Sequence, residues 1–337
     1  MQGKFSAKVD KLAHAIQKRQ ALWLSDEAKR KRGIKVTVRL ISNFARLWER
    51  ITEQTPNGSC QWGSTLFLGE GDADLYIILN TSTHDYSGAP LPEIDFPSPE
   101  RVWGLHTEPP EYVKLFRLDR PEEHQKISRF YTSCEFLYCQ NPTKYIPCPP
   151  YNLMHVDRSW DFLVKAALPK KTENLCMIAS SFNRIEGHQT RLNFVDELSH
   201  SALEFSLWGK GDGFQKYSNY RGVASKKWDV FSSCKYSIVV ESSMAPFYWT
   251  DQLTDSLLSF SLPLYYGSSK VNQYLPEDCY IPIDIHSPDC VEIIKKIAES
   301  REYEKRLPAI IEARQKILYE QNLFAFLDRE VNAFFRK

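Results

Sequence analysis

The sequence predicts an α/β fold in which two Rossmann-like domains face each other across a cleft. Short apolar runs alternate with amphipathic helical stretches from residue 36 to residue 105, and the same alternation restarts over residues 175–266. A proline-rich stretch, 140–172, separates the two series and shows no sustained periodicity. Because strands that alternate with helices build βαβ units around a largely parallel sheet, the two series indicate two sheets in two domains.

Each expected element follows from its hydrophobic pattern. The expected strands are short apolar runs, at 36–41, 65–68, 75–79, 102–105, 175–179, 203–208, 236–241 and 262–266. The expected helices have apolar residues three or four positions apart, at 43–52, 189–198, 226–233, 249–259, 288–300, 303–319 and 323–335. We therefore expect an N-terminal α/β domain at 1–160, a C-terminal α/β domain at 161–320, and a helix at 321–337 that packs back on the first domain.

The composition is that of a globular protein and excludes several classes of function. The 337 residues are 42% hydrophobic and 25% charged, and 43 Lys and Arg nearly balance 42 Asp and Glu, so no overall field attracts nucleic acid. No apolar run approaches the roughly 20 residues that cross a bilayer, and the first residues lack the apolar core of a secretory signal. Eight Cys without a C-x-x-C pair predict reduced, mostly buried thiols and no metal site. We expect a cytoplasmic protein.

The N-terminal end is distinctly basic. Residues 1–50 hold 13 Lys and Arg against 4 Asp and Glu. Within residues 1–30, apolar side chains at helical spacing form one stripe: Phe5, Val9, Leu12 and Ile16. This pattern fits a helix docked on its own domain with a solvated basic face, which we favour. The alternative is an interfacial helix, with peripheral contact at the inner membrane surface.

The candidate ligand-binding residues are polar side chains that directly follow expected strands of the second series. In α/β proteins, ligands bind at the carboxyl ends of parallel strands. The candidates are Ser180, Ser181, Asn183, Gly209, Lys210, Gly211, Glu241, Ser242 and Ser243. The glycines at 209–213 lack the spacing of a phosphate loop, and Asp72 and Asp74 are too few to specify a metal, so we interpret both stretches as turns.

The segment 236–268 carries a specific resemblance. It runs strand, polar loop, helix, strand and glycine turn, with Glu-Ser-Ser, then Tyr-Trp-Thr-Asp-Gln, then Leu-Pro-Leu-Tyr-Tyr-Gly. This order resembles the donor-site motif of family 10 glycosyltransferases, the α1,3/α1,4-fucosyltransferases, with its EN(S/T), YVTEK and (I/V)P(V/I)YxG blocks. Upstream, the segment 181–195 is similar to the family's S-N…R…V stretch, and RVWGLHTEPP is similar to its WxxxESP motif.

The resemblance implies a GT-B type fold and an inverting transfer of L-fucose from GDP-fucose to a glycan or lipid-linked saccharide acceptor, with no cofactor or metal required. It assigns the general base to Glu108 and the donor phosphates to Arg191. The other implied donor-site residues are Asn183, Glu241, Ser243, Tyr248, Thr250, Asp251 and Gln252, with Lys226 as a candidate cation. Four of these assignments have a structural alternative: Glu108 as a helix cap, Asp251 as a helix-start charge, Arg191 as a surface cation and Tyr248 as a core ring.

Two departures from the motif keep other functions open. Asp251 and Gln252 stand where the family has Glu and Lys, and Ser242 stands where it has Asn. A lost charge-assisted contact costs about 1.5 to 3 kcal/mol, so either Lys226, Lys227 or Lys210 substitutes or the donor is another nucleotide sugar. The remaining alternative is a non-catalytic descendant that binds a nucleotide sugar or a glycan.

Overall fold

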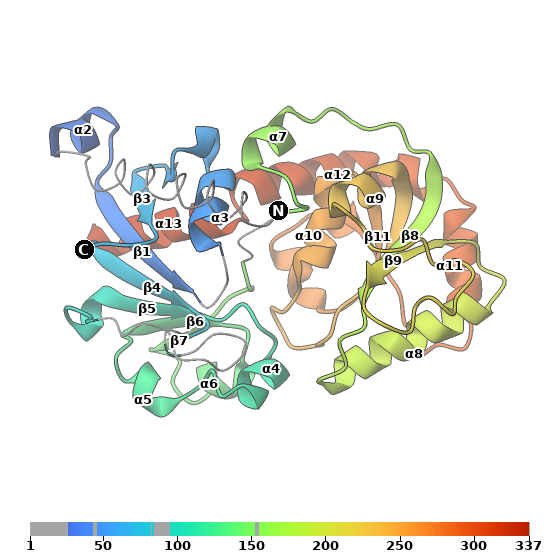
Figure 1. Cartoon of the computed structure of the whole chain (residues 1–337), viewed down its shortest axis with the longest axis horizontal. Coiled ribbons are helices and arrows are strands. Elements are labelled where there is room, and N and C mark those ends of the chain that lie inside the picture. The colour runs from blue at the N-terminus through green and yellow to red at the C-terminus, as the bar shows by residue number, and fades with distance from the viewer. Residues whose placement is uncertain (1–25, 43–45, 82, 84–94, 152–154, 337) are drawn as a thin grey trace, which may run out of the picture. The chain divides into compact units, whose positions relative to one another are not determined.

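The computed structural model describes residues 26–42, 46–81, 83, 95–151 and 155–336 (Figure 1). The chain divides into two compact units. The first comprises Met1–Leu105, Arg120–Phe130 and Leu323–Lys337, and the second comprises His106–Asp119 and Tyr131–Asn322. The expected ranges 1–160 and 161–320 differ from this division, because residues 106–119 and 131–160 group with the later part of the chain.

The earlier part of the chain contains a seven-stranded sheet in the order β2-β3-β1-β4-β5-β6-β7. Its strands are β1 (Val36–Ser42), β2 (Gln61–Trp62), β3 (Thr65–Leu68), β4 (Leu75–Leu79), β5 (Val102–Leu105), β6 (Arg129–Thr132) and β7 (Tyr145–Pro147). β1 lies between β3 and β4 and is parallel to both, whereas the short β2 is antiparallel to β3. Every residue of β3, β4 and β5 is buried, as expected for parallel strands that are covered on both faces.

Short helices connect these strands, and the last helix of the chain returns to the first unit. Helix α2 (Asp26–Lys31) precedes β1. The connecting helices are α3 (Leu47–Glu53), α4 (Pro110–Leu115), α5 (Pro121–His124) and α6 (Glu135–Tyr138), with 3-10 turns η1 (Pro56–Gly58) and η2 (Pro99–Arg101). Helix α13 (Leu323–Phe335), red in Figure 1, lies beside the blue strand β3. The Phe324 ring packs edge-on against Phe67 at 5.0 Å, and Thr65 Oγ1 donates to Asp328 Oδ1 at 2.7 Å.

The second unit contains a five-stranded sheet in the order β12-β11-β10-β8-β9, with all neighbouring strands parallel. Its strands are β8 (Glu173–Ser180), β9 (Ser206–Lys210), β10 (Cys234–Val240), β11 (Leu262–Tyr266) and β12 (Ile281–Pro282). Its helices are α7 (Trp160–Lys165), α8 (Glu186–His200), α9 (Lys227–Ser233), α10 (Asp251–Leu258), α11 (Cys290–Ala298) and α12 (Glu302–Tyr319), with 3-10 turns η3 (Ser269–Gln273) and η4 (Glu277–Cys279). One apolar core joins the sheet to these helices, with Tyr236, Phe231 and Leu257 fully buried.

The strongly apolar strands and the last helix agree with the sequence prediction. Strands β3, β4, β5 and β11 and helix α13 have the predicted bounds. β9 begins at Ser206, whereas the predicted strand began at residue 203. The predicted start was too early because Leu203 and Phe205 are apolar core residues that precede the strand. The prediction missed β2, β6, β7, β12 and helices α5 to α7, which show neither an uninterrupted apolar run nor a helical period. The basic stripe at residues 1–25 lies outside the described residues.

Several chemical features are absent from the described part of the chain. Within it, no helix is both long and apolar enough to span a membrane. No group of three or more His, Cys, Asp or Glu side chains is placed to hold a metal ion among residues 26–42, 46–81, 83, 95–151 and 155–336. All eight cysteines are free thiols, and all except Cys139 are buried.

Candidate donor-binding site

A cavity of about 290 Å³ lies in the second unit at the carboxyl ends of β8, β9 and β10. The strand ends contribute Ser180 and Lys210, and three helices contribute Arg191 from α8, Lys227 from α9 and Gln252 from α10. The other lining residues are Asp157, Ile178, Ala179, Gly209, Val223, Ala224 and Val240. The charged residues that line the cavity are three cations, Arg191, Lys210 and Lys227, and one carboxylate, Asp157. This excess of positive charge suits an anionic ligand.

Arg191 presents an incompletely bonded guanidinium to the cavity. Its Nη2 donates to Ser180 Oγ at 3.3 Å, whereas its buried Nε has no partner among the described residues. Burial lowers the pKa of the guanidinium, and the nearby Glu241 and Tyr248 act in the opposite direction. A buried cationic donor without an acceptor is costly, so an anionic oxygen from a ligand would be stabilised here.

Glu241 follows the last residue of β10 and is only 3% exposed. Its Oε1 accepts a hydrogen bond from the Thr250 backbone N–H at 2.9 Å, whereas its buried Oε2 has no partner in the described part of the chain. Burial raises the pKa of this carboxyl to about 7. Gly267 makes room for it, because a Cβ at that position would lie 2.7 Å from Glu241 Cγ.

The first residues of α10 organise the side of the cavity that Gln252 lines. Thr250 is the N-cap, and its Oγ1 accepts from the Gln252 N–H at 3.2 Å. This bond satisfies a donor that the helix itself leaves unpaired. Asp251 is the first helical residue, and its carboxylate accepts from the Lys227 ammonium.

Lys227 joins two carboxylates of α10. Its Nζ donates to Asp251 and, at 3.0 Å, to Asp255 Oδ2, while Asp255 Oδ1 accepts from the Val156 N–H at 2.7 Å. Burial by itself lowers the pKa of the ammonium, but Asp251 and Asp255 outweigh burial and raise it, so Lys227 keeps its proton. The neighbouring His155 is buried with an unpartnered Nδ1 among the described residues, and burial lowers its pKa to about 4, so its ring is neutral at pH 7.

Tyr248 connects the site electrostatically to Glu108, which belongs to the same unit. Tyr248 is 3% exposed, and burial, together with the charges of Glu241 and Glu108, raises the pKa of its hydroxyl well above the usual value. Glu108 is half-buried in the loop between β5 and α4 and does not line the cavity. The N-cap of α4 is Pro109, so Glu108 lies one residue before the cap position.

The remaining predicted residues lie further from the cavity. Ser243 Oγ donates to Glu111 Oε1 at 3.1 Å and accepts from the Ala245 N–H at 3.2 Å. Asn183 is exposed and donates to Gln189 Oε1 at 2.8 Å. Lys226 is exposed at the N-cap of α9, and neither it nor Asn183 lines the cavity.

The structure thus gathers Arg191, Glu241, Thr250, Asp251 and Gln252 at one end of the second sheet. It adds groups that the sequence did not single out, namely His155, Glu111 and His188. His188 is buried beside Arg191, and burial, with the Arg191 charge, lowers its pKa to about 4. No local pattern marks these residues. Of the three candidate lysines, Lys210 and Lys227 line the cavity, and the start of α9 decides between the adjacent Lys226 and Lys227.

Part of the chain is similar to a known family of proteins. The model described as "Glycosyltransferase family 10 (fucosyltransferase) C-term" matches residues 168–305. The rat (Rattus norvegicus) protein named 4-galactosyl-N-acetylglucosaminide 3-alpha-L-fucosyltransferase 9 is 29% identical over 153 residues, which are 44% of this chain and 38% of that protein. The chain therefore aligns with little more than a third of that relative's length.

Two solved structures are similar in fold. A mutant of T4 phage BGT in complex with UDP-glucose has a TM-score of 0.50 and 13% identity over 87% of this chain and 99% of that chain. Anabaena Alr3699/HepE in complex with UDP-glucose has a TM-score of 0.50 and 9% identity over 90% and 100% of the two chains. The predicted α/β fold class of the GT-B type is thereby confirmed. Residues 168–305 match the model of the C-terminal domain of glycosyltransferase family 10.

Proposed function

We propose that the protein is an inverting glycosyltransferase that moves L-fucose from GDP-fucose to a hydroxyl of a glycan acceptor. The observation that carries this proposal is the cationic cavity formed by Arg191, Lys210 and Lys227 inside the segment that matches family 10. A nucleotide-sugar donor carries a diphosphate, and this cavity supplies that group with unpaired or charged donors. The rat relative is named a 3-alpha-L-fucosyltransferase, so L-fucose is the first candidate for the sugar of the donor.

The leaving diphosphate requires stabilisation as its bond to the sugar breaks. In a single displacement, the acceptor oxygen attacks the anomeric carbon, and the electron pair of the breaking C–O bond passes to the diphosphate. The unpartnered Nε of Arg191 is a donor that is already in place and needs no reorganisation. The N-terminus of α8 adds a favourable dipole to the same end of the sheet.

The acceptor hydroxyl must lose a proton as it attacks. We assign this proton to the Glu108 carboxylate, whose charge acts on Tyr248 within the same unit. General bases of this kind contribute about 10² to 10⁴ in rate. The transition state has oxocarbenium character. Glu241 has one carboxyl oxygen without a partner among the described residues, and we assign that oxygen to a hydrogen bond with a hydroxyl of the donor sugar.

We assign to Lys227 the role of the lysine that the family has in its YVTEK block and that is Gln252 in this chain. Gln252 lines the cavity without a charge, whereas Lys227 lines the same cavity with its proton held by two carboxylates. Because Asp251 and Asp255 partly neutralise the Lys227 ammonium, we expect Lys227 to attract a diphosphate less strongly than Arg191 does. Gln252→Lys should therefore strengthen GDP binding, by roughly tenfold for about 1.4 kcal/mol of charge-assisted contact.

A donor panel tests the proposal. The full chain is incubated with GDP-fucose, GDP-mannose, UDP-glucose and UDP-galactose, with N-acetyllactosamine as acceptor, and nucleotide release and product are both measured. We expect transfer from GDP-fucose with inversion of the anomeric centre, and Arg191→Ala should weaken donor binding whereas Asn183→Ala should not. Transfer from a different donor would contradict the assignment of L-fucose but would still show that the protein is a glycosyltransferase. Binding without transfer from any donor supports the non-catalytic alternative and refutes the proposal.

A further inference from the structure

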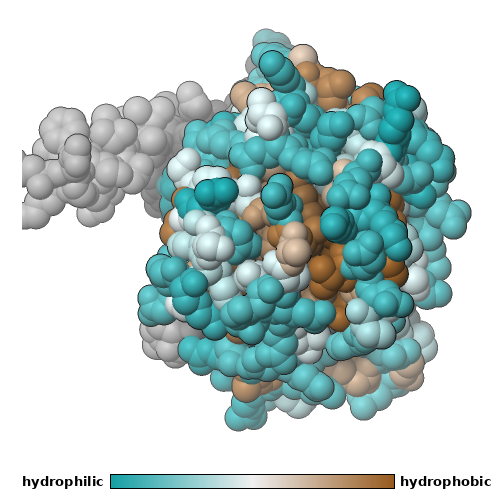
Figure 2. All heavy atoms as spheres, turned by 90° about the vertical axis from the view of Figure 1, so that its right-hand side faces the viewer, coloured by the Kyte–Doolittle hydropathy of each residue, from teal (hydrophilic) through white to brown (hydrophobic). Residues whose placement is uncertain are grey.

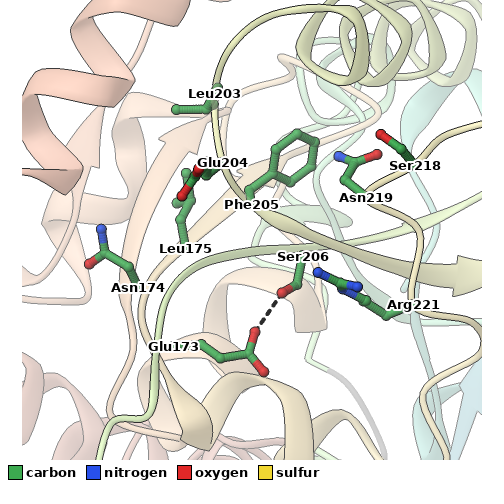
Figure 3. A pocket seen from close by; sticks show the side chains of 10 residues that line it. All are labelled: Glu173, Asn174, Leu175, Leu203, Glu204, Phe205, Ser206, Ser218, Asn219 and Arg221. Atoms are coloured by element: carbon green, nitrogen blue, oxygen red, sulfur yellow. Dashed lines mark hydrogen bonds between the residues drawn. The ribbon is translucent and has the colours of Figure 1, made fainter.

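A second cavity, of about 730 Å³, lies in the second unit at the other end of the sheet (Figure 3). It is lined by Glu173 and Ser206, the first residues of β8 and β9, whereas the donor cavity is lined by Ser180 and Lys210, their last residues. The two cavities therefore lie at opposite ends of the same two strands. No residue lines both.

Asn219 supplies this second cavity with an unpaired donor and an unpaired acceptor. Its backbone carbonyl accepts from the Leu207 N–H at 3.0 Å, which holds its loop beside β9. Its side-chain Nδ2 and Oδ1 are both buried, and neither has a hydrogen-bond partner among the described residues. Buried amides are normally bonded, so both polar atoms of the Asn219 side chain are available to a partner from outside the chain, either water or a ligand.

The other walls combine carboxylates, a guanidinium and apolar surface. Figure 3 shows Glu173 and Glu204 on one side and Arg221 on the other, and Ser206 Oγ donates to Glu173 Oε2. Leu203 and Phe205 add apolar surface between them. Figure 2 looks onto the side of the molecule that carries α11 and shows apolar surface within a rim of hydrophilic residues.

We propose that this cavity binds a neutral saccharide at a site separate from the donor cavity. Adjacent sugar hydroxyls each donate and accept, so one pair of them satisfies both atoms of the Asn219 carboxamide. Further hydroxyls donate to Glu173 and Glu204, and the C–H face of a pyranose ring covers the apolar wall. The two carboxylates, Glu173 and Glu204, outnumber the one guanidinium, Arg221, which disfavours phosphate groups and acidic sugars.

Calorimetric titration of the full chain with N-acetyllactosamine, lactose and maltose tests this site without any nucleotide. We expect saturable binding of at least one of them, which Asn219→Leu weakens at least tenfold and which Arg191→Ala in the donor cavity leaves unchanged. Gln215→Leu, which removes an exposed amide from the same loop, is the matched control and should bind as the native chain does.

The melting temperature of Asn219→Leu separates binding from folding. Because the carboxamide makes no hydrogen bond to the described residues, its removal should leave the melting temperature unchanged or raise it. The proposal is overturned if none of the three sugars binds, if Asn219→Leu binds them as well as the native chain, if guanosine binds in their place, or if this variant melts several degrees lower. A nucleotide-sugar donor takes no part in any of these measurements, so their result does not depend on the transferase activity.

Discussion

Lys227 and Lys226 are adjacent in the chain but have different surroundings. Lys227 contacts Asp251 and the fully buried Asp255, whereas Lys226 is exposed at the N-cap of α9. The bonds to Asp251 and Asp255 make Lys227 part of the fold as well as of the cavity. A variant at this position therefore affects both stability and donor binding.

Lys227→Met should destabilise the protein far more than Lys226→Met. Removing the ammonium leaves two carboxylates facing each other, one of them buried, which costs roughly 3 to 5 kcal/mol. An exposed lysine contributes only a few tenths, up to about 0.5 kcal/mol. Urea unfolding of both variants gives the two free energies. Equal losses would show that the pairing with Asp251 and Asp255 does not form.

Glu241 should make stability depend on pH. Burial raises its pKa to about 7 in the folded chain from an ordinary value of 4.5, so the unfolded chain loses this proton first as pH rises. The free energy of unfolding therefore falls between these pH values, by about 3 kcal/mol in total, and the loss persists at higher pH.

Glu241→Gln removes this dependence while keeping an oxygen that accepts from Thr250. Unfolding at pH 5 and at pH 8 should show little difference between variant and native protein at the lower pH and a clear gain in the variant at the higher pH. Glu186→Gln, an exposed change on α8, is the control. A gain of the same size at both pH values would mean that Glu241 is not held in a desolvated position.

At the scale of elements, α8 is positioned by a close backbone approach. Gly187 lies in its first turn, and a Cβ there would come 1.8 Å from the backbone carbonyl oxygen of Ser242, in the loop after β10. Arg191 lies one turn further along the same helix. The spacing between the two backbones thus sets the position of the donor-site guanidinium.

Gly187→Ala should force the start of α8 away from this loop. We expect a loss of roughly 1 to 3 kcal/mol in stability, as for other overpacked sites, together with weaker binding of GDP because Arg191 moves. Thermal unfolding and GDP titration check this, with Gln189→Ala, an exposed change two residues later, as the control. Native GDP affinity in Gly187→Ala would show that α8 can shift without moving the site.

The sequence predicted the strongly apolar elements well and the short elements of mixed composition poorly. Buried parallel strands such as β10 and amphipathic helices such as α13 carry enough apolar residues to define a period, whereas α6 spans only Glu135–Tyr138. The expectation that polar residues after strands form the site placed Ser180, Lys210 and Glu241 at the carboxyl end of one sheet. It could not choose Lys227 over Lys226, because a shift of one residue in the start of α9 changes which lysine lines the cavity.

His155 lay beyond sequence reasoning for a different reason. It stands in the proline-rich stretch, where no periodicity locates a side chain, and its position beside Lys227 depends on contacts far along the chain, such as the bond from Val156 N–H to Asp255. Asn219 is similar, because only the packing of its loop against β9 buries its carboxamide.

The whole molecule must supply both the general base, Glu108, and the guanidinium that binds the diphosphate, Arg191. Glu108 and Arg191 belong to the same compact unit, and the charges of both act in the surroundings of Tyr248. The two roles are separable by experiment, because the base acts only on the acceptor proton and the guanidinium only on the donor.

The most direct measurement is the turnover of Glu108→Gln with GDP-fucose and N-acetyllactosamine, taken together with its affinity for GDP-fucose. The glutamine keeps the size of the side chain but cannot take the proton, so transfer should fall by a factor of about 10² or more. The dissociation constant for GDP-fucose should stay within about twofold of the native value, because Arg191 and Lys227 are untouched. Native turnover in this variant would contradict the account.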